Sequence, residues 1–146
     1  MIVGLGTTLG HDDAIGLVLV DSLAGEAAFG GCCVLLESAD AATVASSLLE
    51  WRRPVVLVDA ADMNLAPGEY RFFSDKDASV ILKTSSVSTH GLGLAEGLEL
   101  ARALGFDQTA CVFGVQPFDL SPGQGLTPEM SSRVPLLLAA LREACC

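Results

Sequence analysis

Short runs of consecutive apolar residues recur along the chain, and they constrain its fold more than any other feature. Val55–Val58 is apolar throughout, and comparable runs occupy Met1–Leu5, Cys32–Leu36 and Ala110–Val115. A strand with one solvated face alternates apolar and polar side chains, whereas a strand covered on both faces is apolar at every position. Helical patterns separate the runs. We therefore predict one α/β domain over residues 1–146, a three-layer αβα sandwich around a mostly parallel twisted sheet of about five strands.

Helices are predicted where apolar residues recur at helical spacing or where helix-end residues occur. Asp40 is a predicted N-cap, and Thr127 is a second one, with Pro128 in the first helical position. Pro135 removes a backbone donor inside the last helix, which predicts a bend there. The predicted helices run over Asp13–Leu23, from Asp40 to Trp51, over Leu92–Leu104, and from Thr127 to Ala144.

The middle of the chain has a weaker pattern. A Pro67-Gly68 turn precedes Tyr70–Phe73, which we predict to be an edge strand. Ser74–Ser88 has no clear period, and we expect a long surface segment there that contains the short apolar run Val80–Leu82.

The charge balance limits the partners of this chain. It has 18 acidic against 8 basic residues, and its formal net charge is −10. Such a chain lacks the basic surface that binds phosphate backbones, so nucleic acid is an improbable partner, whereas cationic surfaces and metal ions are compatible. No apolar stretch approaches the roughly 18–20 residues that span a bilayer. The N-terminus also lacks the basic flank and cleavage site of a signal peptide, so we expect a cytoplasmic protein without membrane insertion.

Cysteine and serine chemistry are poorly supported. The five cysteines form no C-x-x-C pair, so we expect free thiols rather than a zinc or redox motif. Cys32, Cys33 and Cys111 lie in apolar, strand-like runs that disfavour a reactive thiolate. Several serines precede His90, but no G-x-S-x-G motif surrounds them.

The first glycine-rich loop does not match a phosphate-binding motif. Gly4, Gly6 and Gly10 have the spacing G-x-G-x-x-x-G, which is neither the dinucleotide fingerprint nor a P-loop. Asp12 and Asp13 occupy the helix start where an anion would sit, and they would repel a phosphate. One interpretation is structural, with Asp12 as the helix cap and Asp13 complementing the helix dipole. The other is that one of these carboxylates points across the top of the sheet to bind a cation.

A possible cation site combines residues from three segments. Asp59 ends a buried strand, and ligands of open α/β sheets gather at the carboxyl ends of the strands. His90 begins a helix, whose positive end keeps the imidazole neutral and available as a ligand. With Asp13, these residues form an O/O/N donor set with open coordination positions. His11 is expected to face solvent, and Asp62 is expected on the surface or supporting a ligand.

The chain resembles the hydrogenase maturation proteases over nearly its whole length. The resemblance rests on four segments in matching order and spacing: "GLGTTLGHDDAIG", "LVDAADMNLAPGEYRFF", "STHGLGLAEGL" and "FGVQPFDLSPGQGLTPEM". Within them, "DAADMNLAPGE" is most similar to the branch that serves hydrogenase 3-type or coenzyme F420-reducing enzymes. The resemblance implies that Asp13, Asp59 and His90 bind nickel, or a surrogate divalent ion. It also implies that the nickel is presented by the precursor of a nickel-iron hydrogenase large subunit, rather than held as a resident cofactor.

The implied activity is removal of the C-terminal extension of that precursor. Asp13 or Asp59 as general base, or a metal-polarised water, are the alternatives for catalysis. One residue departs from the family pattern: Thr7 stands where the family usually has Asn after the second glycine. This departure motivates an alternative function, a metal-sensing chaperone that binds the precursor without cleaving it.

Overall fold

The computed structural model describes residues 1–83 and 89–145, without the side chains of residues 83 and 89–92. Its centre is a five-stranded sheet in the order β2-β1-β3-β5-β4. Four strands are parallel, and β4 pairs antiparallel with β5 at one edge. The strands are β1 (Ile2–Gly6), β2 (Cys33–Glu37), β3 (Val55–Ala60), β4 (Tyr70–Ser74) and β5 (Ala110–Val115).

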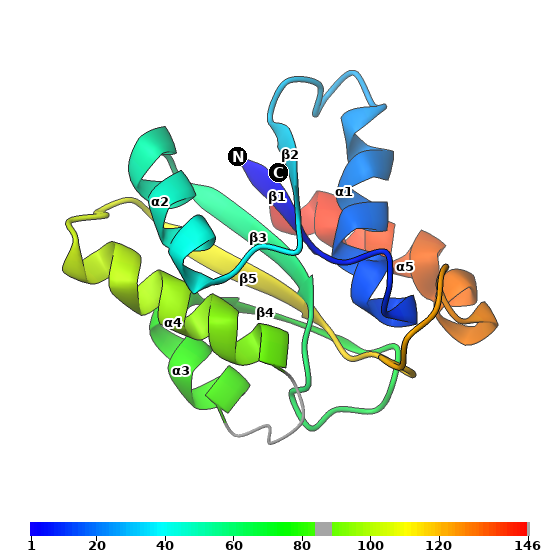
Figure 1. Ribbon diagram of the computed structural model, residues 1–146. Helices are drawn as coiled ribbons and strands as arrows, with labels where there is room; N and C mark the ends of the chain where they lie inside the picture. The colour runs from blue at the N-terminus through cyan, green and yellow to red at the C-terminus, as the bar shows by residue number, and fades with distance from the viewer. Residues whose placement is uncertain (84–88, 146) are drawn as a thin grey trace.

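Helices cover both faces of this sheet, which confirms the predicted αβα sandwich (Figure 1). Two separate hydrophobic cores result, one on each side of the strands. One face carries α1 (Ile15–Ala24) and α5 (Pro128–Cys145), and the other carries α2 (Ala41–Trp51), α3 (Asp75–Lys83) and α4 (Thr89–Ala103).

The helix ends follow the local sequence. Asp40 Oδ1 accepts a hydrogen bond from Thr43 N at 2.8 Å, which confirms the predicted cap of α2. Thr127 Oγ1 likewise accepts from Met130 N at 3.1 Å at the start of α5. The last helix continues through Pro135 to Cys145.

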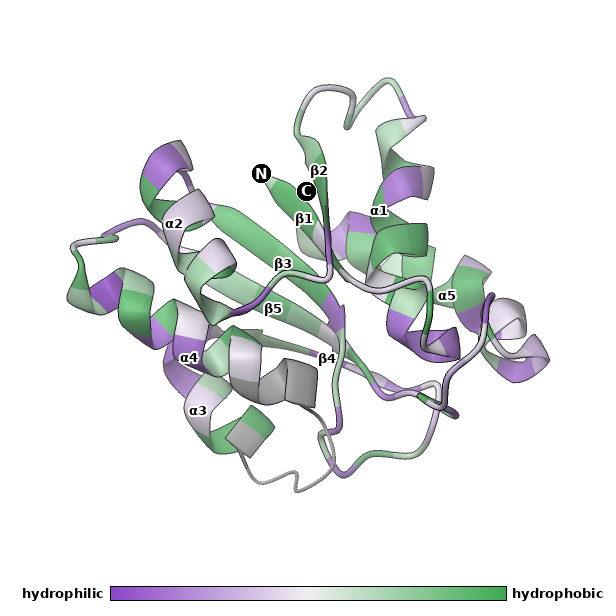
Figure 2. Ribbon diagram, viewed as in Figure 1, coloured by the Kyte–Doolittle hydropathy of each residue, from purple (hydrophilic) through white to green (hydrophobic). Residues whose placement is uncertain are grey.

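The strands differ in how completely they are buried. The central strand β3 is hydrophobic along most of its length and becomes hydrophilic only near its end, at Asp59 (Figure 2). We predicted a buried strand at Cys32–Leu36, but β2 is an edge strand and Leu35 is 45% exposed. Tyr70–Phe73 lies in the opposite edge strand, as predicted.

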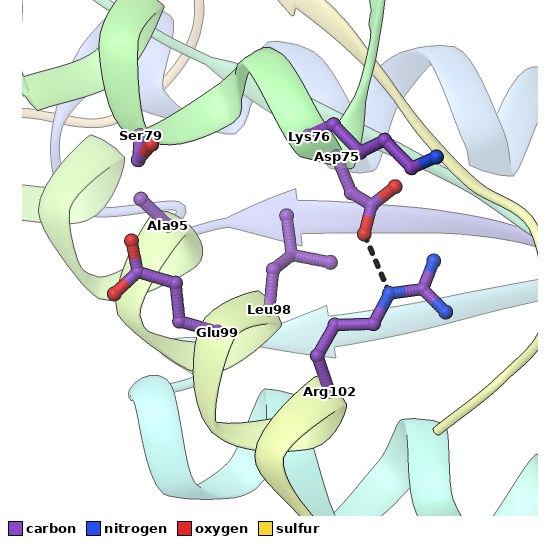
Figure 3. A pocket seen from close by; sticks show the side chains of 7 residues that line it. All are labelled: Asp75, Lys76, Ser79, Ala95, Leu98, Glu99 and Arg102. Atoms are coloured by element: carbon purple, nitrogen blue, oxygen red, sulfur yellow. Dashed lines mark hydrogen bonds and ion pairs between the residues drawn. The ribbon is translucent and has the colours of Figure 1, made fainter. Parts of the chain in front are cut away.

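The prediction of a surface segment over Ser74–Ser88 is wrong for residues 75–83, which form α3. Three apolar residues face the core from this helix: Ala78, Ile81 and Leu82. An ion pair fixes its first residue, because Arg102 Nε on α4 lies 2.7 Å from Asp75 Oδ2 (Figure 3). Ala78, Ile81 and Leu82 have the i, i+3, i+4 spacing of a helix, so the helical pattern is present but covers only about one turn. Residues 84–88 lie outside the described part of the chain.

The cysteines with described positions are half-buried: Cys32, Cys33, Cys111 and Cys145. Three of them line a cavity at the amino-terminal edge of the sheet: Cys32, Cys111 and Cys145. Burial raises the pKa values of Cys33 and Cys111, which is consistent with thiols that are not activated as nucleophiles. Within the described residues, no helix is both long enough and apolar enough to cross a bilayer.

Candidate active site

Two buried carboxylates meet at the carboxyl ends of β1 and β3. Asp13 lies in the 3-10 turn η1 (His11–Ala14) that follows β1, and Asp59 is the penultimate residue of β3. Each is only 2% exposed. Glycines allow this approach, since a Cβ at Gly6 would collide with the Asp13 carbonyl and one at Gly16 would collide with the backbone of β1 and β3. The turn after β1 therefore packs directly on the sheet edge.

The two carboxylates interact unfavourably with each other. Burial raises the pKa of Asp59 well above its usual range, and the negative charge of Asp13 raises it further, against a hydrogen bond from the backbone of Ala60. Asp59 Oδ1 is buried and has no hydrogen-bond partner among the described residues. Asp13 Oδ2 accepts a hydrogen bond from Thr7 N at 3.0 Å. A cation is the ligand that would relieve this arrangement.

The third predicted ligand comes from α4. A recess at this edge is lined by Asp59 and by Leu94 of α4, with Leu5, Gly6, Ala39 and Val44. His90 is the second residue of α4, one turn before Leu94. Positions 90 and 94 therefore lie on the same face of the helix. The side chain of His90 lies outside the described part of the chain. Among the side chains that are described, no group of three His, Cys, Asp or Glu residues could hold a metal ion.

Asp12 does not cap the helix, so that interpretation is wrong. Its carboxylate is fully buried and accepts hydrogen bonds from the loop before α5. Oδ2 accepts from the backbone N–H groups of Phe118 and Asp119 at 2.9 and 3.1 Å. Oδ1 accepts from the backbone N–H and the hydroxyl of Thr127 at 2.8 and 3.0 Å. The adjacent aspartates Asp12 and Asp13 therefore have different partners.

His11 does not simply face solvent as predicted. It is partly buried, and its Nδ1 lies 2.9 Å from the Gly125 carbonyl oxygen. Its backbone N–H donates to Gly123 O at 3.0 Å, and Gly123 N donates to Leu9 O at 2.9 Å. A Cβ on Gly123 would overlap the His11 ring. His11 thus joins the first loop to the segment 116–127.

Gln116, which no sequence motif indicated, holds the loop that follows Asp59. Its side chain is 8% exposed, and Oε1 accepts from Met63 N at 2.7 Å and Leu65 N at 3.3 Å. Its Nε2 donates to Asp62 Oδ1 at 3.1 Å, so Asp62 supports the loop after β3. The only sequence indication was a polar residue directly after the apolar strand β5.

Thr7 holds the first loop mainly through its backbone. Its N–H is the donor to Asp13, a contact that any non-proline residue at this position could make. Its hydroxyl oxygen accepts from Leu9 N at 3.3 Å, within a short side-chain turn. The family's usual amide is therefore not required for the contact with Asp13.

Known proteins match both the sequence and this fold. Residues 20–144 match the family model described as hydrogenase maturation protease. The hydrogenase 2 maturation protease of Escherichia coli is 31% identical over 150 residues, which cover 99% of this chain and 91% of that protein. The chain belongs to the hydrogenase maturation protease family. It is an endopeptidase of that family, which confirms the predicted fold, family and enzyme class.

Solved structures agree with this assignment. The hydrogenase maturating endopeptidase HybD from Escherichia coli superposes with a TM-score of 0.75 at 30% identity, covering 98% of this chain and 91% of that chain. The [NiFe] hydrogenase maturation protease HybD from Thermococcus kodakarensis gives a TM-score of 0.74 at 25% identity, with coverages of 98% and 96%. The branch serving hydrogenase 3-type or coenzyme F420-reducing enzymes stays a prediction.

Proposed function

We propose that this endopeptidase recognises nickel in the precursor of a nickel-iron hydrogenase large subunit, in the cytoplasm, and removes the precursor's C-terminal extension. Asp13, Asp59 and His90 are the proposed nickel-contacting residues. The observation that carries the proposal is the buried pair Asp13–Asp59, in which Asp59 Oδ1 has no partner among the described residues. Two like charges in a desolvated site are stabilised when a cation binds between them.

The proposed donor set suits recognition of a metal that the substrate brings. Two carboxylates and one imidazole match the borderline preferences of Ni²⁺, and other divalent ions can act as surrogates. Three protein ligands leave coordination positions for groups of the precursor. In this scheme nickel is part of the substrate, and the protease reads whether it has been inserted.

The same carboxylates are the groups placed to assist hydrolysis. A water molecule attacks the scissile carbonyl carbon, a carboxylate of the Asp13–Asp59 pair takes its proton, and the proton is delivered to the departing amine as the C–N bond breaks. The recess beside Asp59 is lined mainly by apolar side chains, which limits competing water. The chemistry therefore needs no nucleophilic serine or cysteine.

Cleavage of a defined precursor tests this proposal. The protein is incubated with nickel-loaded and nickel-free large-subunit precursors, and the products are weighed by mass spectrometry. We expect a shortened C-terminus only for the nickel-loaded precursor. The Escherichia coli relative with its own precursor serves as the positive control. An unchanged mass would overturn the protease function, and a stable uncleaved complex would instead support the precursor-binding chaperone.

Titration with Ni²⁺ alone tests the ligand set. We expect His90→Ala to weaken binding at least about tenfold, because changes to residues that only support metal ligands already cost 10–100-fold. Glu99→Gln, an exposed change on the same helix, is the matched control and should bind like the wild type. Equal affinities for His90→Ala and wild type would remove His90 from the site.

A further inference from the structure

The segment 116–127 contacts the loop that contains Asp13 and the loop that follows Asp59. One contact is made by Asp12, which directly precedes Asp13 in the first loop. The other is made by Gln116, whose side chain holds Met63 and Leu65 in the loop that follows Asp59. Both side chains are buried, and both bind backbone groups of a distant segment. We call residues 116–127 the brace.

We propose that Asp12 and Gln116 are positioning residues, which attach the loop that contains Asp13 and the loop that follows Asp59 to the brace and thereby keep the two carboxylates at a fixed position relative to each other. This inference rests on the proposed function of Asp13 and Asp59. It assigns to Asp12 and Gln116 no contact with nickel or with the scissile bond.

The attachment of Asp12 is built from several independent contacts. A parallel β-bridge joins Gly10 to Gly123, and Asp12 N donates to Asp119 O at 3.1 Å. The Asp12 carboxylate then accepts from two backbone N–H groups through one oxygen and from the backbone N–H of Thr127 through the other. Charge-assisted hydrogen bonds of this kind are shorter and stronger than neutral ones. The loop is thus fixed one residue away from Asp13.

Gln116 attaches the loop that follows Asp59. Gln116 N donates to Glu69 O, and Gly68 N donates to Gln116 O, both at 2.8 Å, so the backbone is paired as well. The side-chain amide uses its oxygen for two backbone donors and its nitrogen for Asp62. Movement of the brace would therefore move both the loop that contains Asp13 and the loop that follows Asp59.

Paired variants can separate positioning from plain stability. Asp12→Asn keeps the side-chain size but replaces one acceptor oxygen with an NH₂ group, which faces backbone donors. Gln116→Met keeps the length and removes all three hydrogen bonds. We expect each variant to lower kcat/KM on the nickel-loaded precursor by about 10–100-fold. Ni²⁺ binding should weaken by a similar factor, as it does when residues that support metal ligands are replaced.

The control is a variant that destabilises the fold far from the brace. Val55→Ala removes buried methyl groups at the amino-terminal end of β3 and touches neither loop. At a temperature where all variants remain folded by circular dichroism, Val55→Ala should keep the wild-type kcat/KM. Thr127 adds a graded test: Thr127→Val removes the hydroxyl donor to Asp12, whereas Thr127→Ser retains it and should restore most of the lost rate.

Hydrogen exchange supplies a readout that is independent of the reaction. Asp12→Asn should accelerate exchange at the amides of Phe118, Asp119 and Thr127, with little change in β3. The positioning role is overturned if these amides exchange faster while kcat/KM and Ni²⁺ affinity stay at wild-type values. A wild-type protein that neither binds Ni²⁺ nor cleaves the precursor would instead overturn the proposed function.

Discussion

Buried carboxylates at the same sheet edge form two groups, Asp12 alone and the pair Asp13–Asp59, which differ in what surrounds them. Asp12 is fully buried and accepts hydrogen bonds from three backbone N–H groups and one hydroxyl. Asp59 is equally inaccessible, but it faces Asp13 and its pKa is raised. A buried carboxylate stabilises a fold where donors surround it, and it destabilises the fold where another carboxylate faces it. The first arrangement is structural, whereas the second is the one that the proposed function assigns to nickel binding.

Catalysis gives the largest expected difference between the two groups. Asp59→Asn should reduce precursor cleavage by about 10²–10⁴-fold, because it removes both a proposed nickel ligand and a candidate general base. The measurement is the rate of product formation by mass spectrometry at saturating precursor. Asp12→Asn should lose less than Asp59→Asn. Equal losses for the two variants would show that Asp12 and Asp59 act in the same way.

Stability should change in opposite directions in the two groups. Asp12→Ala leaves three backbone donors of the brace without their acceptor, so we expect the free energy of unfolding to fall by about 2–4 kcal/mol. Asp59→Asn removes a buried charge that has no compensating donor on Oδ1, so we expect the free energy of unfolding to rise. Urea denaturation of both variants checks the signs. A loss of stability in Asp59→Asn would contradict the conclusion that the buried charge of Asp59 destabilises the fold.

The sequence predicted the fold well where local pattern was sufficient. Val55–Val58 is apolar throughout because β3 is covered on both faces, and Asp40 and Thr127 are recognisable as caps from their immediate neighbours. The helix over Asp75–Lys83 was missed although Ala78, Ile81 and Leu82 have the i, i+3, i+4 spacing of a helix, because this pattern covers only about one turn. The packing of these residues in the core and the ion pair of Asp75 with Arg102 stabilise the helix, and neither contact is visible in the sequence.

The site was predictable to the extent that topology determines it. Parallel strands end at one edge, so residues following β1 and β3 were expected to converge, and Asp13 and Asp59 do. The role of Asp12 could not be predicted, because its partner Thr127 lies 115 positions away and the intervening loops have no regular geometry. Adjacent aspartates are equivalent in a sequence until their partners are known.

The pH dependence of stability tests whether the carboxyl group of Asp59 has a raised pKa in the folded protein. A carboxyl group with a raised pKa in the folded state binds its proton more tightly there than in the unfolded chain, where its pKa is about 3.9. Its favourable contribution is therefore complete below that value and is lost as the pH rises through the folded pKa. We expect Asp59→Asn to melt near the wild type at pH 4 and several degrees higher by pH 8.

Thermal melts across this range are the measurement, with Asp21→Asn as the control. Asp21 is exposed on α1, so its replacement removes the same formal charge without changing the site. The difference between Asp59→Asn and wild type should grow with pH, whereas the difference for Asp21→Asn should stay nearly constant. A constant difference for both variants would mean that Asp59 does not titrate abnormally.

The smallest expected effect concerns the residue in which this chain departs from its family. Thr7→Asn should keep kcat/KM within about threefold of wild type, because the donor to Asp13 is the backbone N–H and an Asn side chain can make the same short turn. Thr7→Ala, which lacks the acceptor for Leu9 N, should lower the free energy of unfolding by about 0.5–1.5 kcal/mol. A tenfold gain in cleavage by Thr7→Asn would instead place the amide on the substrate, and the rigid backbone contact would then be insufficient for full activity.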